Sequence, residues 1–202
     1  MITTANIFSP AHGGPIITAD LDIVLGCYYL TLVRDGAKGE GKIFRDFQEV
    51  LLAYTEGHID LGARIKVRLP EGLEIVHEGR DDKVIEGNLL PTTAGRILFH
   101  DIQPKGMRFY NKTMNKKALN SVVSDCHITV GRHATVQFLD AMKETGFHFA
   151  TVSGISFAAS DLRTPVSKAK IIAAAEDDVA KIEDAHQMGD ITNGERYNQI
   201  VD

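Results

Sequence analysis

The side chains most often used in catalysis are present in this sequence, but their spacing matches no common catalytic motif. None of the eight histidines forms a His-x-x-x-His or His-Glu-x-x-His pair, the spacings that place two zinc ligands on one helix face. Ser153 stands in Val-Ser-Gly and lacks the Gly-x-Ser-x-Gly turn that exposes a hydrolase nucleophile. The glycine-rich run 36–42 lacks the Gly-x4-Gly-Lys-Ser/Thr spacing that wraps a phosphate. The sequence therefore predicts neither a catalytic residue nor a metal site in this chain.

Charge is distributed unevenly along the chain, and this pattern bears on its partners. The net charge of −5 over 202 residues argues against an independent nucleic-acid-binding domain, because such domains carry cations that replace the counterions of phosphate. From Lys105 to His133, however, six cations stand against one anion, whereas from Asp161 to Asp202 there are five cations and nine anions. A basic middle and an acidic end predict two surfaces with different partners; two ordinary solvated faces are the alternative.

Composition predicts a folded protein with no membrane segment. A chain of this length that is 44% hydrophobic supports one globular domain, or one domain with an appendage. It contains no run of about 18 apolar residues and no cleavable leader pattern, so we expect no membrane partner and a cytoplasmic location. Cys27 and Cys126 lack Cys-x-x-Cys spacing and are expected to be buried thiols rather than a disulfide or a zinc site.

The spacing of apolar residues predicts short elements up to about residue 160. Apolar side chains recur every three or four positions over 44–54, with Gly57 just beyond, which is typical of a helix with a glycine cap. Alternation over 63–69 and 73–77 predicts a hairpin. The runs 23–30 and 92–102 fit either a helix or a strand. Further helices are predicted over 115–125, with Lys116 and Lys117 on its outer side, and over 134–145, ending at Gly146 before an extended segment 147–151.

The remaining residues have a different pattern, which predicts an antiparallel helical hairpin. A helix is expected from Pro165 to Met188, with Thr164 as its N-cap and one narrow apolar seam at 172, 175, 179, 182 and 186. The sequence Thr-Asn-Gly-Glu at 192–195 fits a capping box that begins a second helix, which we expect to be truncated. Together these patterns predict an α+β fold: an irregular mixed domain of short helices and hairpins (1–160), followed by a truncated helical hairpin (161–202).

Six segments occur in the same order as in one known family. They are T-T-A-N-I-F-S-P-A-H-G-G-P-I-I at 3–17, D-I-V-L-G-C-Y-Y at 22–29, G-E-G at 39–41 with A-R-I-K-V-R at 63–68, T-T-A-G-R at 92–96, T-G-F at 145–147 leading to A-T-V-S-G at 150–154, and G-E-R-Y-N at 194–198. This series resembles the largest (β′) subunit of bacterial DNA-directed RNA polymerase over essentially the whole chain. The resemblance identifies the chain as an internal fragment of that subunit.

The resemblance implies a function within an assembled polymerase, a nucleotidyltransferase that carries out transcription. The segment resembles the region that follows the family's N-A-D-F-D-G-D loop, whose aspartates hold the catalytic Mg²⁺; this chain has no such loop. The isolated chain is therefore predicted to be inactive and to bind no cofactor, with Mg²⁺ held elsewhere in the full enzyme. The implied partners are the β, α, ω and σ subunits, the DNA template, RNA, nucleoside triphosphates and secondary-channel factors, in the bacterial cytoplasm at the nucleoid.

Particular residues follow from the same resemblance. Residues 1–160 resemble the pore, or wall of the secondary channel through which nucleotides enter, and 161–202 resemble the start of its funnel rim, where factors dock. The implied channel residues are Arg96, Lys112, Lys116 and Lys117. The implied docking residues are Glu183, Asp184, Asp190 and Asn193.

The chain departs from the family pattern at several polar positions. The family's Asn is His12, its Pro-Ser-Gln is Ala19-Asp20-Leu21, its Arg before Ser-Gly is Val152, and its first Asp of an Asp-Asp pair is Ser160. Two alternatives stand beside a polymerase segment: a non-catalytic module that only docks transcription factors, and a small-molecule-binding α+β protein, since fold class alone fixes no function.

Overall fold

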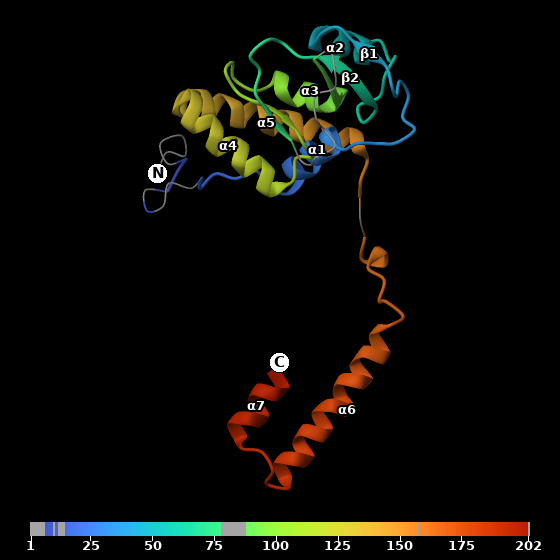
Figure 1. Cartoon of the computed structure of the whole chain (residues 1–202), viewed down its shortest axis with the longest axis vertical. Helices are drawn as coiled ribbons and strands as arrows, with labels where there is room; N and C mark the ends of the chain where they lie inside the picture. Colours follow the sequence, from blue (N-terminus) through green and yellow to red (C-terminus); the bar gives the residue numbers. More distant parts are fainter. Residues whose placement is uncertain (1–6, 10, 12–14, 78–87, 157, 202) are drawn as a thin grey trace. The chain divides into compact units, whose positions relative to one another are not determined.

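The computed structural model describes residues 7–9, 11, 15–77, 88–156 and 158–201 of the chain (Figure 1). The chain divides into two compact units, Met1–Ile155 and Ser156–Asp202. Short helices and small sheets make up the first unit and helices the second, so the predicted α+β class is confirmed. Among the described helices, none has the length and apolar character needed to cross a membrane.

Helix α1 (Leu21–Thr31) makes extensive contacts within the first unit. It packs against α5 (Arg132–Ser153) along one side and against the start of α3 (Ala94–Asp101) at its C-terminal end. These contacts are close because glycines stand at the crossings: a Cβ on Gly26 would fall 1.8 Å from the carbonyl oxygen of Gly146, and one on Gly95 would fall 1.7 Å from that of Leu30. Helix α4 (Lys116–Val130) lies beside α5 (Figure 1), and their apolar faces form the larger core cluster.

The prediction that a helix ends at Gly146 and is followed by an extended segment is wrong. Helix α5 continues through Gly146 and ends at Ser153, with Gly154 in the left-handed conformation at φ 61°. Gly146 allows the backbone of α1 to approach, and the helical packing that this creates holds residues 147–151 in the same helix. A glycine in a helical pattern can mark either the C-terminal cap of a helix or a close approach of two helices, and Gly146 marks the close approach of α1 and α5.

The strands form two separate sheets. In the first, β1 (Ile43–Phe44) pairs parallel with β2 (Arg64–Arg68), which pairs antiparallel with β4 (Leu89–Thr93). In the second, β3 (Ile75–His77) pairs parallel with β5 (Phe109–Asn111). The predicted hairpin of 63–69 with 73–77 is therefore wrong in its pairing, although both strands exist: β2 already has a partner on each edge, so β3 pairs elsewhere.

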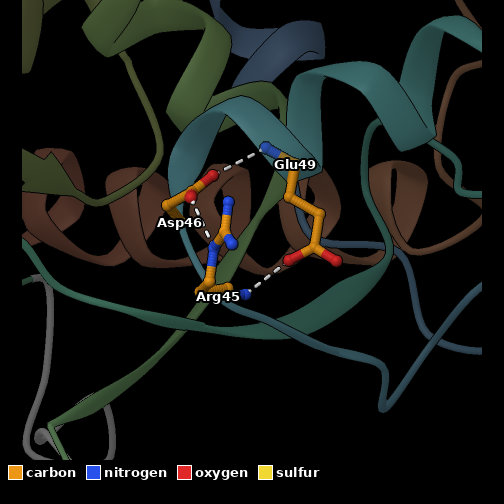
Figure 2. A network of polar contacts seen from close by, with 3 residues as sticks. All are labelled: Arg45, Asp46 and Glu49. Atoms are coloured by element: carbon orange, nitrogen blue, oxygen red, sulfur yellow. Dashed lines mark hydrogen bonds and ion pairs between the residues drawn. The ribbon is translucent and has the colours of Figure 1, made fainter.

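Helix α2 (Phe47–Thr55) covers the first sheet and confirms the predicted amphipathic helix, with Gly57 at φ 68° just beyond it. Its N-terminus is capped by side chains (Figure 2): the Glu49 N–H donates to Asp46 Oδ1 at 2.9 Å, and the Arg45 N–H donates to Glu49 Oε2 at 2.6 Å. The Arg45 guanidinium also contacts Asp46 Oδ2 at 3.0 Å. These bonds satisfy amides that have no partner inside the helix.

The second unit is a helical hairpin after a short 3-10 turn, η2 (Ala159–Asp161). Helix α6 (Lys168–Gln187) begins three residues after the predicted start at Pro165, and its N-cap is Ser167 rather than Thr164. Helix α7 (Asn193–Val201) begins at the predicted capping box, in which the Thr192 N–H donates to Glu195 Oε2 at 2.8 Å and the Glu195 N–H donates to Thr192 Oγ1 at 3.3 Å. The hairpin is thus confirmed.

Candidate functional site

Three lysines implied as channel residues cluster where β5 leads into α4. We call Lys112, Lys116 and Lys117 the basic surface. Asn115 caps α4, accepting from the Ala118 N–H at 2.9 Å, so Lys116 and Lys117 occupy the first turn. The N-terminus of a helix carries a partial positive charge, and the first turn of α4 contains no carboxylate to offset it. This end of α4 is therefore a place where anions are attracted.

Lys112 is held over an aromatic ring. Its ammonium lies 5.6 Å from the centroid of Tyr110, within the range of a cation–π contact. The Tyr110 hydroxyl donates to Asp125 Oδ2 at 2.7 Å, and the Arg108 guanidinium donates to the same oxygen at 3.0 Å. Burial, followed by the bond to Asp125, raises the pKa of Tyr110, so this hydroxyl stays protonated and keeps donating at neutral pH. The ring that carries Lys112 is thereby fixed on α4.

Lys116 is paired with a carboxylate from α1. Its ammonium lies 3.0 Å from Asp20 Oδ1, which also accepts the Leu21 N–H at 3.0 Å. The hydrogen bond from Lys116, followed by the one from Leu21, lowers the pKa of Asp20, which is therefore ionised at neutral pH. The N-termini of α1 and α4 are joined by this contact.

Lys117 differs from both of its neighbours. It is exposed, and among the residues that the structure describes it forms no ion pair. The three lysines therefore present one ammonium over a ring, one in an ion pair and one directed to solvent. An arrangement of this kind can attract a polyanion such as a triphosphate, but it contains no nucleophile or base for a reaction.

Arg96 lies apart from the basic surface and is buried, with 4% of its area exposed. Its Nη1 donates to Asn111 Oδ1 at 2.9 Å and its Nε donates to the Thr31 carbonyl at 3.3 Å. Thr92 donates to the same Asn111 oxygen at 2.9 Å, and Asn111 Nδ2 donates to the Pro91 carbonyl at 2.8 Å. Arg96 thus joins α3 to the end of α1 and to β5, and Asn111 joins β5 to β4. The burial of Arg96 argues against direct contact with a nucleotide.

The comparisons with known proteins agree with the sequence resemblance. A family model described as RNA polymerase Rpb1, domain 3, matches residues 6–162, which include every described element of the first unit. This chain belongs to the RNA polymerase Rpb1 domain 3 family. The predicted resemblance to bacterial β′ subunits is confirmed as well.

The curated relatives of this Rpb1 domain 3 chain are much longer proteins. It is 42% identical over 202 residues to a DNA-directed RNA polymerase subunit beta' of Rhodopirellula baltica and 44% identical over 202 residues to one of Dehalococcoides mccartyi. A third such subunit, of Stutzerimonas stutzeri, is 42% identical over 205 residues. Each match covers 100% of this chain and 14% of the relative, so the chain spans about one seventh of their length.

The predicted docking residues lie in the second unit. Glu183 and Asp184 are exposed near the end of α6, Asp190 is exposed in the turn, and Asn193 is the first residue of α7. An apolar groove on α6 is lined by Ile172, Ala175, Glu176, Val179, Ala180 and Glu183. The structure gathers acidic side chains beside apolar ones here, and their role in docking stays a prediction.

The positions that depart from the family pattern differ in burial: Ala19 is buried in the larger core cluster, and the other departing positions that the structure describes are exposed. Leu21 is 83% exposed at the first position of α1 with φ 47°, Val152 is half-exposed near the end of α5, and Ser160 is exposed in η2. His12 lies outside the described residues.

Sequence reasoning missed Asp20 and Tyr110 as partners of the basic surface. An N-cap signal before the apolar run 23–30 would have marked Asp20 as a helix cap, but its contact with Lys116, 96 residues away, has no local signal.

Proposed function

We propose that this chain acts as part of the β′ subunit of an assembled bacterial RNA polymerase and contributes there to template-directed RNA synthesis. The observation that carries the proposal is the match of its entire length to β′ subunits at 42–44% identity. In that assembly its partners would be the β, α, ω and σ subunits, DNA and RNA. Such an enzyme would work in the cytoplasm, at the nucleoid.

Within the enzyme, the basic surface would border the channel through which nucleoside triphosphates enter. Lys112, Lys116 and Lys117 lie beside the positive end of α4, so an approaching triphosphate meets several sources of positive potential at once. Attraction of this kind raises the local concentration of substrate and leaves the chemical step unchanged. It should therefore act on KM and should weaken as salt increases.

The catalytic Mg²⁺ of the enzyme would be held outside this chain. Among the described residues no group of three or more His, Cys, Asp or Glu side chains lies close enough together to hold a metal ion. This is consistent with the proposal that the magnesium is held elsewhere in the enzyme. We assign this chain no catalytic residue and no cofactor.

The test replaces Lys112, Lys116 and Lys117 with Ala in the assembled polymerase. We expect KM for nucleotides to rise about fivefold at low salt and less than about twofold at high salt, with kcat unchanged. A matched control replaces Lys38, Lys66 and Arg68 with Ala. These three side chains are exposed or half-exposed, and their replacement removes the same charge from the region of the first sheet. An unchanged KM in the first triple variant, or an equal rise in the control, would reject the channel role.

A second candidate function, docking of transcription factors, is favoured by the second unit. Glu183 lines the apolar groove on α6, and Asp184 and Asp190 are exposed further along the hairpin, a combination that suits a partner with basic residues around an apolar anchor. Replacing the three by Lys in the assembled polymerase should abolish binding of such a factor while factor-free RNA synthesis continues. Retained binding would remove this candidate.

A further inference from the structure

The Asp20 carboxylate lies between two helix N-termini and contacts a lysine of the basic surface. It is the N-cap residue of α1, and its Oδ1 accepts hydrogen bonds from both the Leu21 N–H and the Lys116 ammonium, each at 3.0 Å. Both ends are positive, and Lys116 and Lys117 add two formal charges in the first turn of α4. Asp20 is therefore the counter-charge that α4 does not supply within its own first turn.

The contact contributes little to the stability of the fold. Both side chains are more than half exposed, at 52% for Lys116 and 61% for Asp20, and exposed ion pairs gain little because water screens them. The α1 cap does not depend on the pair either, because an uncharged oxygen at position 20 can accept the Leu21 N–H. The main consequence of the pair is that it fixes the position of the Lys116 ammonium and limits its contact with a phosphate.

We propose that Asp20 sets the strength of nucleotide capture by holding the Lys116 ammonium in an ion pair. Asp20 is a positioning residue: it acts through Lys116 and does not itself touch the nucleotide. An ammonium held by a carboxylate must exchange partners before it contacts a phosphate, whereas a released one contacts it directly. This inference rests on the proposed role of the basic surface in nucleotide entry.

The experiment compares four assembled polymerases: wild type, Asp20→Asn, Lys116→Ala and the double variant. Asn keeps an acceptor oxygen for the cap and removes the charge. We expect Asp20→Asn to lower KM for nucleotides about threefold at low salt, with kcat unchanged, because it frees Lys116. In the Lys116→Ala background the same replacement should lower KM by less than about 1.5-fold. A purely structural role of Asp20 would not make the effect on KM depend on the presence of Lys116.

Two results would overturn the proposal while leaving the channel role intact. If Asp20→Asn lowers KM equally with and without Lys116, Asp20 acts as an isolated charge and not through that lysine. If it leaves KM unchanged while the triple lysine variant raises KM, the ion pair does not limit capture. An unchanged KM in the triple variant would instead reject the proposed channel role of the basic surface, and this inference with it.

Discussion

Gly146 lies directly against Ile23: a Cβ on Gly146 would fall 2.9 Å from the Cα of Ile23, so α1 and α5 meet backbone to backbone. The reciprocal position, Gly26, is tighter still, because its Cβ would meet the Gly146 carbonyl oxygen at 1.8 Å. These contacts hold α1 in place. Its N-cap Asp20 contacts Lys116 of the basic surface, and its last residue, Thr31, accepts a hydrogen bond from the buried Arg96.

Replacing Gly26 with Ala should therefore destabilise the first unit by about 3 kcal/mol, since both helices must move apart to admit one methyl group. Thermal and denaturant unfolding of the chain would measure the change. Gly194→Ala is the matched control, because a Cβ there meets nothing within 4 Å, and it should leave unfolding of the first unit unaltered. Equal stability of the Gly26→Ala variant and wild type would show that the two helices are not in this close contact.

A second prediction concerns the buried polar cluster. Asn111→Ala should cost about 3 kcal/mol, because it leaves the Arg96 guanidinium, the Thr92 hydroxyl and the Pro91 carbonyl each without a partner that it has now. Urea unfolding followed by circular dichroism measures this difference. Gln48→Ala, at an exposed position on α2, should change stability by less than about 0.5 kcal/mol. A cost for Asn111→Ala as small as that of the control would contradict the bonds described here.

Several errors of the sequence-based interpretation share one physical cause. Local patterns predict a helix end at Gly146 because they carry no sign of its neighbour α1, more than a hundred residues earlier. They predict a hairpin of 63–69 with 73–77 because proximity in sequence favours hairpins, whereas the true partner of β3, the strand β5, follows about 30 residues later. Local signals succeeded where the structure is local: the Thr192 box, the α2 helix and the start of α4 at Asn115.

In the candidate site, too, the features set by local sequence are predictable and those set by long-range contacts are not. The positions of Lys116 and Lys117 on the outer side of a helix followed from local periodicity and are confirmed. The burial of Arg96 and the pairing of Lys116 with Asp20 depend on contacts across 65 and 96 residues, and neither has a signature in sequence spacing.

Acid should weaken the N-terminus of α2. The Glu49 N–H, followed by Arg45, holds the pKa of Asp46 below its ordinary value of 3.8, so the folded state favours the ionised form. The contribution of this charge is therefore fully present above the unfolded-state pKa and is lost as pH falls through the lower folded-state value. Melting temperatures should show wild type above Asp46→Asn at pH 7, and the difference should shrink as the pH falls below 3.8. A difference that stays constant over this range would mean that the Asp46 charge is not coupled to folding.

The two thiols should be unreactive in the folded chain. Burial raises the pKa of Cys27 to about 12, and burial also raises that of Cys126, so hardly any thiolate forms at pH 8. Both cysteines are free and buried, as predicted from the sequence. Reaction with a disulfide reagent at pH 8 should be slow for the native chain and complete within minutes in denaturant, and a fast native reaction would show that one thiol is accessible.

The last prediction concerns the hairpin of the second unit, where α7 covers α6 unevenly. Val179, Ile182 and His186 on the distal half of α6 are half-buried, whereas Ile172 and Ala175 on the proximal half are exposed. Most of the stability of a helix in water comes from packing an apolar face, so amides of the distal half should exchange more slowly than those of the proximal half. Hydrogen exchange followed by mass spectrometry resolves the two halves, with helix α5, one face of which lies in the core of the first unit, as a slowly exchanging internal reference. Ile200→Ala, at the least exposed of the large apolar side chains of α7 (41% exposed), should reduce the difference between them. Equal exchange of both halves in wild type would mean that α7 does not stabilise α6.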